Sequence, residues 1–160
     1  MLVLLMATIV ACGGSTEKES SSEQETVTMQ ADTASAPDAK LNINTASGDQ
    51  FQTIPGVGDN MVHEFEEYRP YVSIQQFRKE IGKYVDSSQV AAYEQYIFVP
   101  IHRNDSDVST LIQIPGLDET EANELVSGRP YENNQAFLDA LSSYISEEEL
   151  STAESYLKSE

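Results

Sequence analysis

The chain repeats itself at an interval of sixty residues, and this repeat limits what it can fold into. Ile54-Pro55-Gly56 returns as Ile114-Pro115-Gly116, and Arg69-Pro70-Tyr71 returns as Arg129-Pro130-Tyr131. Aromatic residues keep the same register, as in the pairs Phe77 and Phe137, Tyr84 and Tyr144, and Tyr96 and Tyr156. A fixed period indicates a duplicated structural unit. We therefore predict two similar units in tandem, residues 39–101 and residues 102–160.

The first copy has the pattern of short helices separated by strong helix-breaking residues. A turn at Pro55-Gly56-Val57-Gly58 breaks the apolar periodicity, and Val57 is expected to point into the core. Side chains that can cap a helix precede each apolar stripe. Helices are therefore predicted over 47–53, from a cap at Asp59 to about Tyr68, after a cap at Ser73, and after a cap within Asp86-Ser87-Ser88 as far as Ile97. A short extended piece is expected at 97–101.

The second copy follows the same order. Helices are predicted over Val108–Ile114 and Glu119–Ser127, then around Phe137, and then after Ser146, whose partner Glu149 completes a capping box. The predicted fold class is all-α. Tyrosines at stripe positions are expected in the core, namely Tyr84, Tyr93, Tyr96, Tyr144 and Tyr156. Arg69 and Arg129 are expected to cap the C-termini of the helices that they follow.

The N-terminal residues are typical of an exported bacterial lipoprotein. Leu2–Val10 is apolar but too short to span a bilayer, and no Lys or Arg precedes it. Ile9-Val10-Ala11-Cys12 resembles a lipobox, which implies a signal peptide at 1–11 and lipidation of Cys12. The alternative is that Cys12 is only a small residue in a hydrophobic leader. Residues 12–38 are poor in large apolar side chains and are expected to be a disordered tether.

The lipobox resemblance also predicts where the protein resides. Acyl chains contribute about 0.8 kcal/mol per buried CH₂, so a lipid on Cys12 would hold the protein on a membrane without a spanning helix. The folded part is therefore expected outside the cytoplasm, anchored to the bacterial cell envelope.

The charge of the chain argues against strong binding to polyanions. The sequence has 27 acidic and nine basic residues, a formal net charge of −18. Residues 101–160 hold 13 of the acidic residues but only three basic ones. The sequence has no nucleophile, base and acid set and no evident metal-ligand spacing, so we predict a protein that is not an enzyme and holds no cofactor.

The opening Leu41-Asn42-Ile43-Asn44-Thr45-Ala46-Ser47, the turn Ile54–Gly58 and the pair Tyr68-Arg69 resemble the helix-hairpin-helix modules of ComEA-type competence DNA receptors. The resemblance covers 41–101 well and the second copy in outline. It implies a compact helical domain whose turn contacts the phosphates of double-stranded DNA without reading bases. By position, the DNA-binding residues would be Pro55, Gly56, Val57, Gly58 and Asn60. In some related modules, turn carbonyls also hold a monovalent cation, here those of Gln52, Ile54 and Val57.

The two turns differ in how well they suit a phosphate. Consecutive N–H groups at Gly56 and Gly58, with a helix dipole behind them, can face an anion. The alternative is that this turn only joins two helices and its amides are capped internally. The resembling modules usually carry Lys or Arg after the turn, whereas this chain has Asp59-Asn60-Met61 with His63 beyond. The second turn has Asp118 in place of the last Gly, so we expect it to bind no DNA.

Two functions remain open from the sequence. The first is an anchored DNA-binding protein for DNA uptake, with weak binding that has no sequence preference. The second is a scaffold lipoprotein that binds an unidentified envelope protein and keeps the fold without DNA binding, as in the PsbU-type extrinsic subunit of photosystem II. The acidic second copy favours the second function. A salt-loving source would also account for the acidic surface, because high ionic strength screens repulsion.

Overall fold

The computed structural model describes residues 39–159. The predicted signal peptide at 1–11, Cys12 and the predicted tether at 12–38 lie outside these residues. Over the range that is described, the chain is mostly helical, with eight helices and one small sheet of two strands. None of these helices combines the length and the apolar character needed to cross a bilayer.

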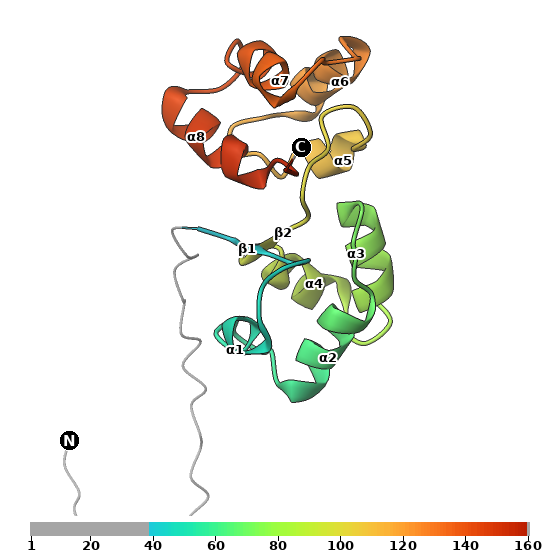
Figure 1. The fold of residues 1–160 in the computed structure, drawn as a ribbon. Coiled ribbons are helices and arrows are strands. Elements are labelled where there is room, and N and C mark those ends of the chain that lie inside the picture. The colour runs from blue at the N-terminus through green and yellow to red at the C-terminus, as the bar shows by residue number, and fades with distance from the viewer. Residues whose placement is uncertain (1–38, 160) are drawn as a thin grey trace, which may run out of the picture. The chain divides into compact units, whose positions relative to one another are not determined.

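Helices α1 to α4 accompany the two strands β1 and β2, and helices α5 to α8 follow them (Figure 1). In chain order the elements are β1 Leu41–Asn42, α1 Gly48–Phe51, α2 Asp59–Glu67, α3 Ile74–Ile81, α4 Ser87–Tyr93, β2 Ile97–Phe98, α5 Val108–Leu111, α6 Glu119–Ser127, α7 Asn134–Leu141 and α8 Glu147–Tyr156.

Only one of the two strands was predicted from the sequence. β1 and β2 are parallel, with Leu41 opposite Ile97 and Asn42 opposite Phe98. The extended piece near Ile97 was predicted, but β1 was not, because two residues are too few to show an alternating pattern. The continuation of the fourth helix to Ile97 was wrong, since α4 ends at Tyr93.

Helix starts follow the capping rules at most positions. The side chains of Ser73, Asp86 and Ser146 accept the backbone N–H three residues on, which confirms three predicted caps. The cap predicted at Asp59 was wrong: Gly58 is the N-cap of α2, and Asp59 is its first helical residue. Gly58 has no side chain with which to accept a hydrogen bond, so this helix begins without a side-chain cap.

Buried apolar side chains form two clusters. The first core includes Phe51, Phe65, Phe77 and Tyr93, and the second core includes Phe98, Leu111, Phe137, Leu141 and Tyr156. Burial of these side chains is the main stabilising contribution to the fold.

The tyrosines expected in the core differ in their burial. Tyr93 and Tyr156 are buried, and Tyr96 and Tyr144 are partly buried against the two cores. Tyr84 was placed wrongly, because it is 47% exposed and its hydroxyl meets that of Tyr68 at 2.8 Å. The apolar periodicity alone assigns Tyr84 to the buried stripe, but its hydroxyl forms a hydrogen bond with the Tyr68 hydroxyl at the surface.

Arg69 and Arg129 make the same contacts sixty residues apart. Arg69 donates from Nε to the Ile43 carbonyl at 2.7 Å and from Nη2 to the Ala46 carbonyl at 2.6 Å. Arg129 donates in the same way to the carbonyls of residues 103 and 106. The prediction that these arginines cap the preceding helices was wrong. Each one instead holds the loop that leads into α1 or α5.

Two asparagines reinforce those loops. Asn44 donates from Nδ2 to the Tyr71 carbonyl and accepts the Tyr71 N–H on Oδ1. Asn104 makes the same pair of hydrogen bonds to Tyr131. The segment before the first helix is therefore tied to the segment after the second helix in both parts of the chain.

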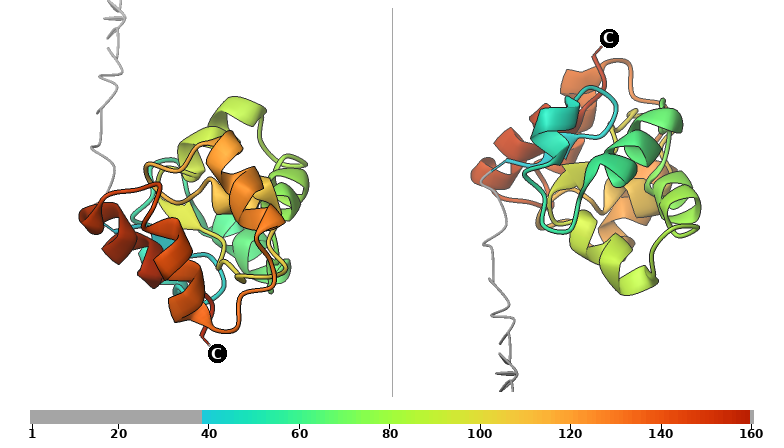
Figure 2. Two further views of the ribbon diagram at one scale, coloured as in Figure 1. Left: turned by 90° about the horizontal axis from the view of Figure 1, so that it is seen from above. Right: turned by 90° about the horizontal axis from the view of Figure 1, so that it is seen from below.

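The C-terminal segment closes the second core as β2 closes the first. Ile101 forms a parallel bridge to Leu157, sixty residues beyond the pair formed by Leu41 and Ile97. Both views of Figure 2 show α8 leading into this final segment. Phe98 and Ile101 pack into the second core.

A buried hydrogen bond joins α3 to α5. The N–H of Ile74, the first residue of α3, donates to Thr110 Oγ1 at 3.0 Å, and both residues are fully buried. This hydroxyl satisfies an N–H at the start of a helix, where no backbone acceptor is present.

Replacing Thr110 with valine is expected to destabilise the protein, because the buried Ile74 N–H loses its acceptor while the side-chain volume barely changes. An unsatisfied buried donor costs about 1–3 kcal/mol. Urea unfolding followed by circular dichroism measures the change. Thr110→Ser is the control, because it keeps the hydroxyl. Equal stability of the Val and Ser variants would contradict the role given to this bond.

Candidate nucleic-acid interface

Two buried apolar side chains anchor the turn between α1 and α2 in the core. Ile54 and Val57 are only 2% and 7% exposed, and the Val57 N–H donates to the Ile54 carbonyl at 3.1 Å. The Tyr93 hydroxyl in α4 donates to the Gly56 carbonyl at 3.1 Å. Gly56 has φ +80°, a conformation that glycine adopts without strain. The turn therefore presents its backbone in a fixed orientation.

The exposed side of this turn carries backbone donors without protein partners. Pro55, Gly56, Gly58 and Asn60 are all exposed. Within residues 39–159, the N–H groups of Gly56, Gly58 and Asn60 have no hydrogen-bond acceptor. The last two lie at the N-terminus of the nine-residue helix α2, where the helix dipole favours negative charge.

The carboxylate of Asp59 does not cover these donors by capping the helix. Its Oδ1 accepts from Gln52 Nε2 at 2.6 Å, on the exposed surface. Asp59 nevertheless adds a negative charge beside the turn, which disfavours a phosphate through simple Coulomb repulsion.

The turn between α5 and α6 has the same backbone but uses one of the three equivalent donors internally. Gly116 also has φ +80°, and the Leu117 N–H donates to the Ile114 carbonyl. Here the N-cap is Asp118, which accepts the Glu121 N–H at 2.8 Å, while Glu121 accepts the Asp118 N–H at 2.9 Å. This reciprocal capping box pairs two N–H groups whose equivalents in the first turn, at Gly58 and Met61, have no acceptor within residues 39–159. The N–H groups of Gly116 and Thr120 have no acceptor in that range either, as at Gly56 and Asn60.

A second difference lies directly over the two glycines. A Cβ added at Gly116 would collide with the Glu149 carboxylate, whereas a Cβ at Gly56 would meet the Gln89 side-chain nitrogen at 3.3 Å. Gln89 and Glu149 are sixty residues apart. A neutral amide therefore lies next to the first turn, and a carboxylate lies next to the second.

The basic side chains within residues 69–83 are mostly engaged by the protein itself. Arg69 holds two loop carbonyls, and Arg78 binds both carboxylate oxygens of Glu94, at 2.7 and 2.8 Å. The hydrogen bond to Glu94 raises the pKa of Arg78. Lys79 and Lys83 both lie beside Glu80. The side chain of Lys79 is 78% exposed, so it is the basic group among these four that solvent reaches most.

The structure brings the predicted turn residues together on one surface, with one distinction. Val57 is buried, so only its backbone belongs to the exposed turn. Of the carbonyls expected around a monovalent cation, that of Ile54 already accepts the Val57 N–H. From the sequence, Glu149 was predicted only as a capping partner and Gln89 was not singled out. The sixty-residue register pairs these two residues with each other, but only the structure places each beside a turn. The predicted lipidation site, Cys12, lies outside the described residues.

Comparisons of the chain with protein-family models, with curated proteins and with solved structures find no match.

Glu149 is expected to titrate below the ordinary range of a glutamate. It accepts hydrogen bonds from the backbone N–H and the hydroxyl of Ser146, and these lower its pKa. Because the folded-state pKa is depressed, the ionised carboxylate stabilises the fold above the unfolded-state pKa, and this contribution is lost as pH falls through the folded value.

Carbon-detected NMR of the side-chain carboxyl measures the pKa of Glu149. Ser146→Ala, which removes one of the two donors, should move the pKa part of the way back. A midpoint for the parent chain at or above that of an unfolded glutamate would rule out the capping role.

Proposed function

We propose that this chain is a non-catalytic helix-hairpin-helix protein with two tandem repeats, tethered outside the cytoplasm through a lipid on Cys12, and that its first turn binds the backbone of double-stranded DNA. The binding is weak and has no sequence preference. The resemblance to ComEA-type receptors supports a role in DNA uptake. The support from the geometry is the set of unpaired N–H groups at Gly56, Gly58 and Asn60.

The contrast between the two turns is the observation that carries this proposal. Both turns have the same backbone conformation at the glycine. The second turn pairs the Asp118 N–H with the Glu121 carboxylate, whereas the equivalent Gly58 N–H of the first turn is exposed and has no acceptor within residues 39–159. An N–H group that is exposed and preorganised can bind a phosphate oxygen without losing an internal hydrogen bond.

The charge of the protein keeps this interaction weak. Affinity for DNA without sequence preference comes mainly from cations that displace counterions, and non-specific complexes have dissociation constants of about 10⁻⁴–10⁻⁶ M. This chain has nine basic residues, and those within residues 69–83 are largely paired. The affinity is expected in or beyond the weak end of that range. Many copies on one membrane would raise the effective affinity.

Protein interaction is the second candidate function, and the pairing of basic side chains favours it. Arg78 with Glu94 and Lys83 with Glu80 are bound to carboxylates that a DNA phosphate would have to displace. Under this alternative, the acidic surface meets an envelope protein of complementary charge.

Copying the second cap onto the first turn should weaken DNA binding. Gly58 and Met61 stand sixty residues before Asp118 and Glu121, so the double variant Gly58→Asp, Met61→Glu installs the same capping box. We expect the helix to become more stable, since a side-chain N-cap contributes about 1 kcal/mol. Binding should weaken because the box pairs the Gly58 N–H and places two further carboxylates beside the turn. Fluorescence anisotropy of a labelled duplex at low salt measures binding.

Gly58→Ala is the matched control. A Cβ at Gly58 meets no atom within 4 Å, and its φ of −104° suits any residue. This variant should bind as the parent does. If the capping-box variant binds as tightly as the parent, the turn is not the DNA contact. If the parent itself causes no anisotropy change at low salt, the protein-interaction candidate takes its place.

The salt dependence of DNA binding is expected to be shallow. Each cation that neutralises a phosphate contributes about −0.9 to the slope of log K against log salt, and few cations near the turn are unpaired. A slope no steeper than about −2 is therefore expected. A slope near −6 would place the contact on another, more basic surface.

A further inference from the structure

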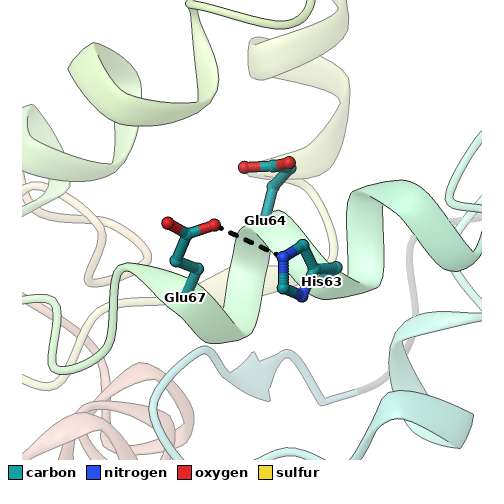
Figure 3. Close-up of side chains that lie close together, drawn as sticks. All are labelled: His63, Glu64 and Glu67. Atoms are coloured by element: carbon teal, nitrogen blue, oxygen red, sulfur yellow. Dashed lines mark ion pairs between the residues drawn. The ribbon is translucent and has the colours of Figure 1, made fainter.

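Helix α2 carries three potential metal ligands that lie close together. One ligand atom from each of His63, Glu64 and Glu67 lies within 4.8 Å of the other two. His63 Nε2 is 3.4 Å from Glu67 Oε2, the contact drawn as a dashed line in Figure 3. We propose that these three side chains bind a divalent transition-metal ion of the Zn²⁺ class. This site lies beyond the proposed DNA contact and does not depend on it.

The spacing of the first two ligands suits a tetrahedral ion. Zinc binds histidine nitrogen and carboxylate oxygen at about 2.0–2.2 Å, which puts two ligands of a tetrahedral site about 3.4 Å apart. The separation between His63 Nε2 and Glu67 Oε2 already has this value. Their side chains are 73% and 53% exposed, so an ion can enter from solvent and keep water as a further ligand. The imidazole nitrogen favours Zn²⁺ over Mg²⁺ or Ca²⁺, which prefer oxygen ligands.

Glu64 supplies an independent observation. Its carboxylate lies beside the Tyr84 hydroxyl and raises the pKa of that group, while the atom Oε2 has almost no accessible surface and no hydrogen-bond partner among the described residues. A buried carboxylate oxygen without a partner is costly. A bound ion would relieve the repulsion between Glu64 and Glu67.

The second half of the chain shows that the fold does not need these ligands. Asn123 and Ser127 stand sixty residues after His63 and Glu67, on the equivalent helix α6. Both donate to backbone carbonyls of their own helix, Asn123 at 2.7 Å and Ser127 at 2.8 Å. The variants His63→Asn and Glu67→Ser therefore introduce the residue types that helix α6 carries at the equivalent positions.

Titration of the full chain in detergent micelles with Zn²⁺ tests the proposal. The imidazole resonances of the two histidines are followed by NMR. His102 is an internal reference, because it lies 3.0 Å from the single carboxylate of Asp105. We expect the His63 resonances to shift with saturation at a 1:1 ratio while those of His102 stay in place. An equal response of both histidines, or no response at about 1 mM Zn²⁺, would overturn the proposal.

Calorimetric affinities of variants complete the test. Loss of a partner that only orients a ligand costs about 10–100-fold in metal affinity, so loss of a direct ligand should cost at least tenfold. We expect this loss for His63→Asn, Glu67→Ser and Glu64→Gln, and no change for the matched control His102→Asn. Unchanged affinity in the first two variants would refute the site. Circular dichroism verifies that each variant is folded, and if one of them unfolds, the other two decide.

Discussion

The paired hydrogen bonds of Arg69 and of Arg129 are the constraint on which the rest of the structure depends. A guanidinium presents donors in a planar fork, which suits two carbonyls three residues apart. Arg69 holds the carbonyls of Ile43 and Ala46 and also lies over the Phe51 ring, 5.0 Å from its centroid. These contacts fix the loop that leads to the cap of α1, and through α1 they fix the position of the turn at 54–58. The same arrangement recurs around Arg129.

One backbone thus supports two turns of opposite chemistry. The core residues and the positive φ of the glycine set the path of each turn, and neither depends on what the exposed side chains do. At the second turn, a capping box satisfies the helix N-terminus, and a carboxylate lies next to the glycine. At the first turn, Gly58 is the N-cap of α2, and the side-chain amide of Gln89 lies next to Gly56. The residues at positions 58, 61 and 89 therefore account for the chemical difference between the two turns.

The position of each carboxylate matters more than the net charge of −18. Asp118, Glu121 and Glu149 are used by the protein itself at helix starts, where negative charge is favourable. Glu64 and Glu67 lie on the face of α2 beside His63 and are not needed to cap it. The formal charge therefore combines carboxylates that stabilise helix starts with carboxylates such as that of Glu67, which is exposed beside His63.

The mostly helical fold, the turns and most of the caps could be predicted from the sequence, because they depend on local features: apolar periodicity, Pro-Gly pairs and capping side chains such as Ser73 and Asp86. Tertiary structure alone decided the strand at Leu41, the loop contacts of Arg69 and the exposure of Tyr84. Each of these depends on a partner far along the chain that spacing does not reveal. For the same reason, sequence reasoning located the first turn but could not say whether its N–H groups were already paired.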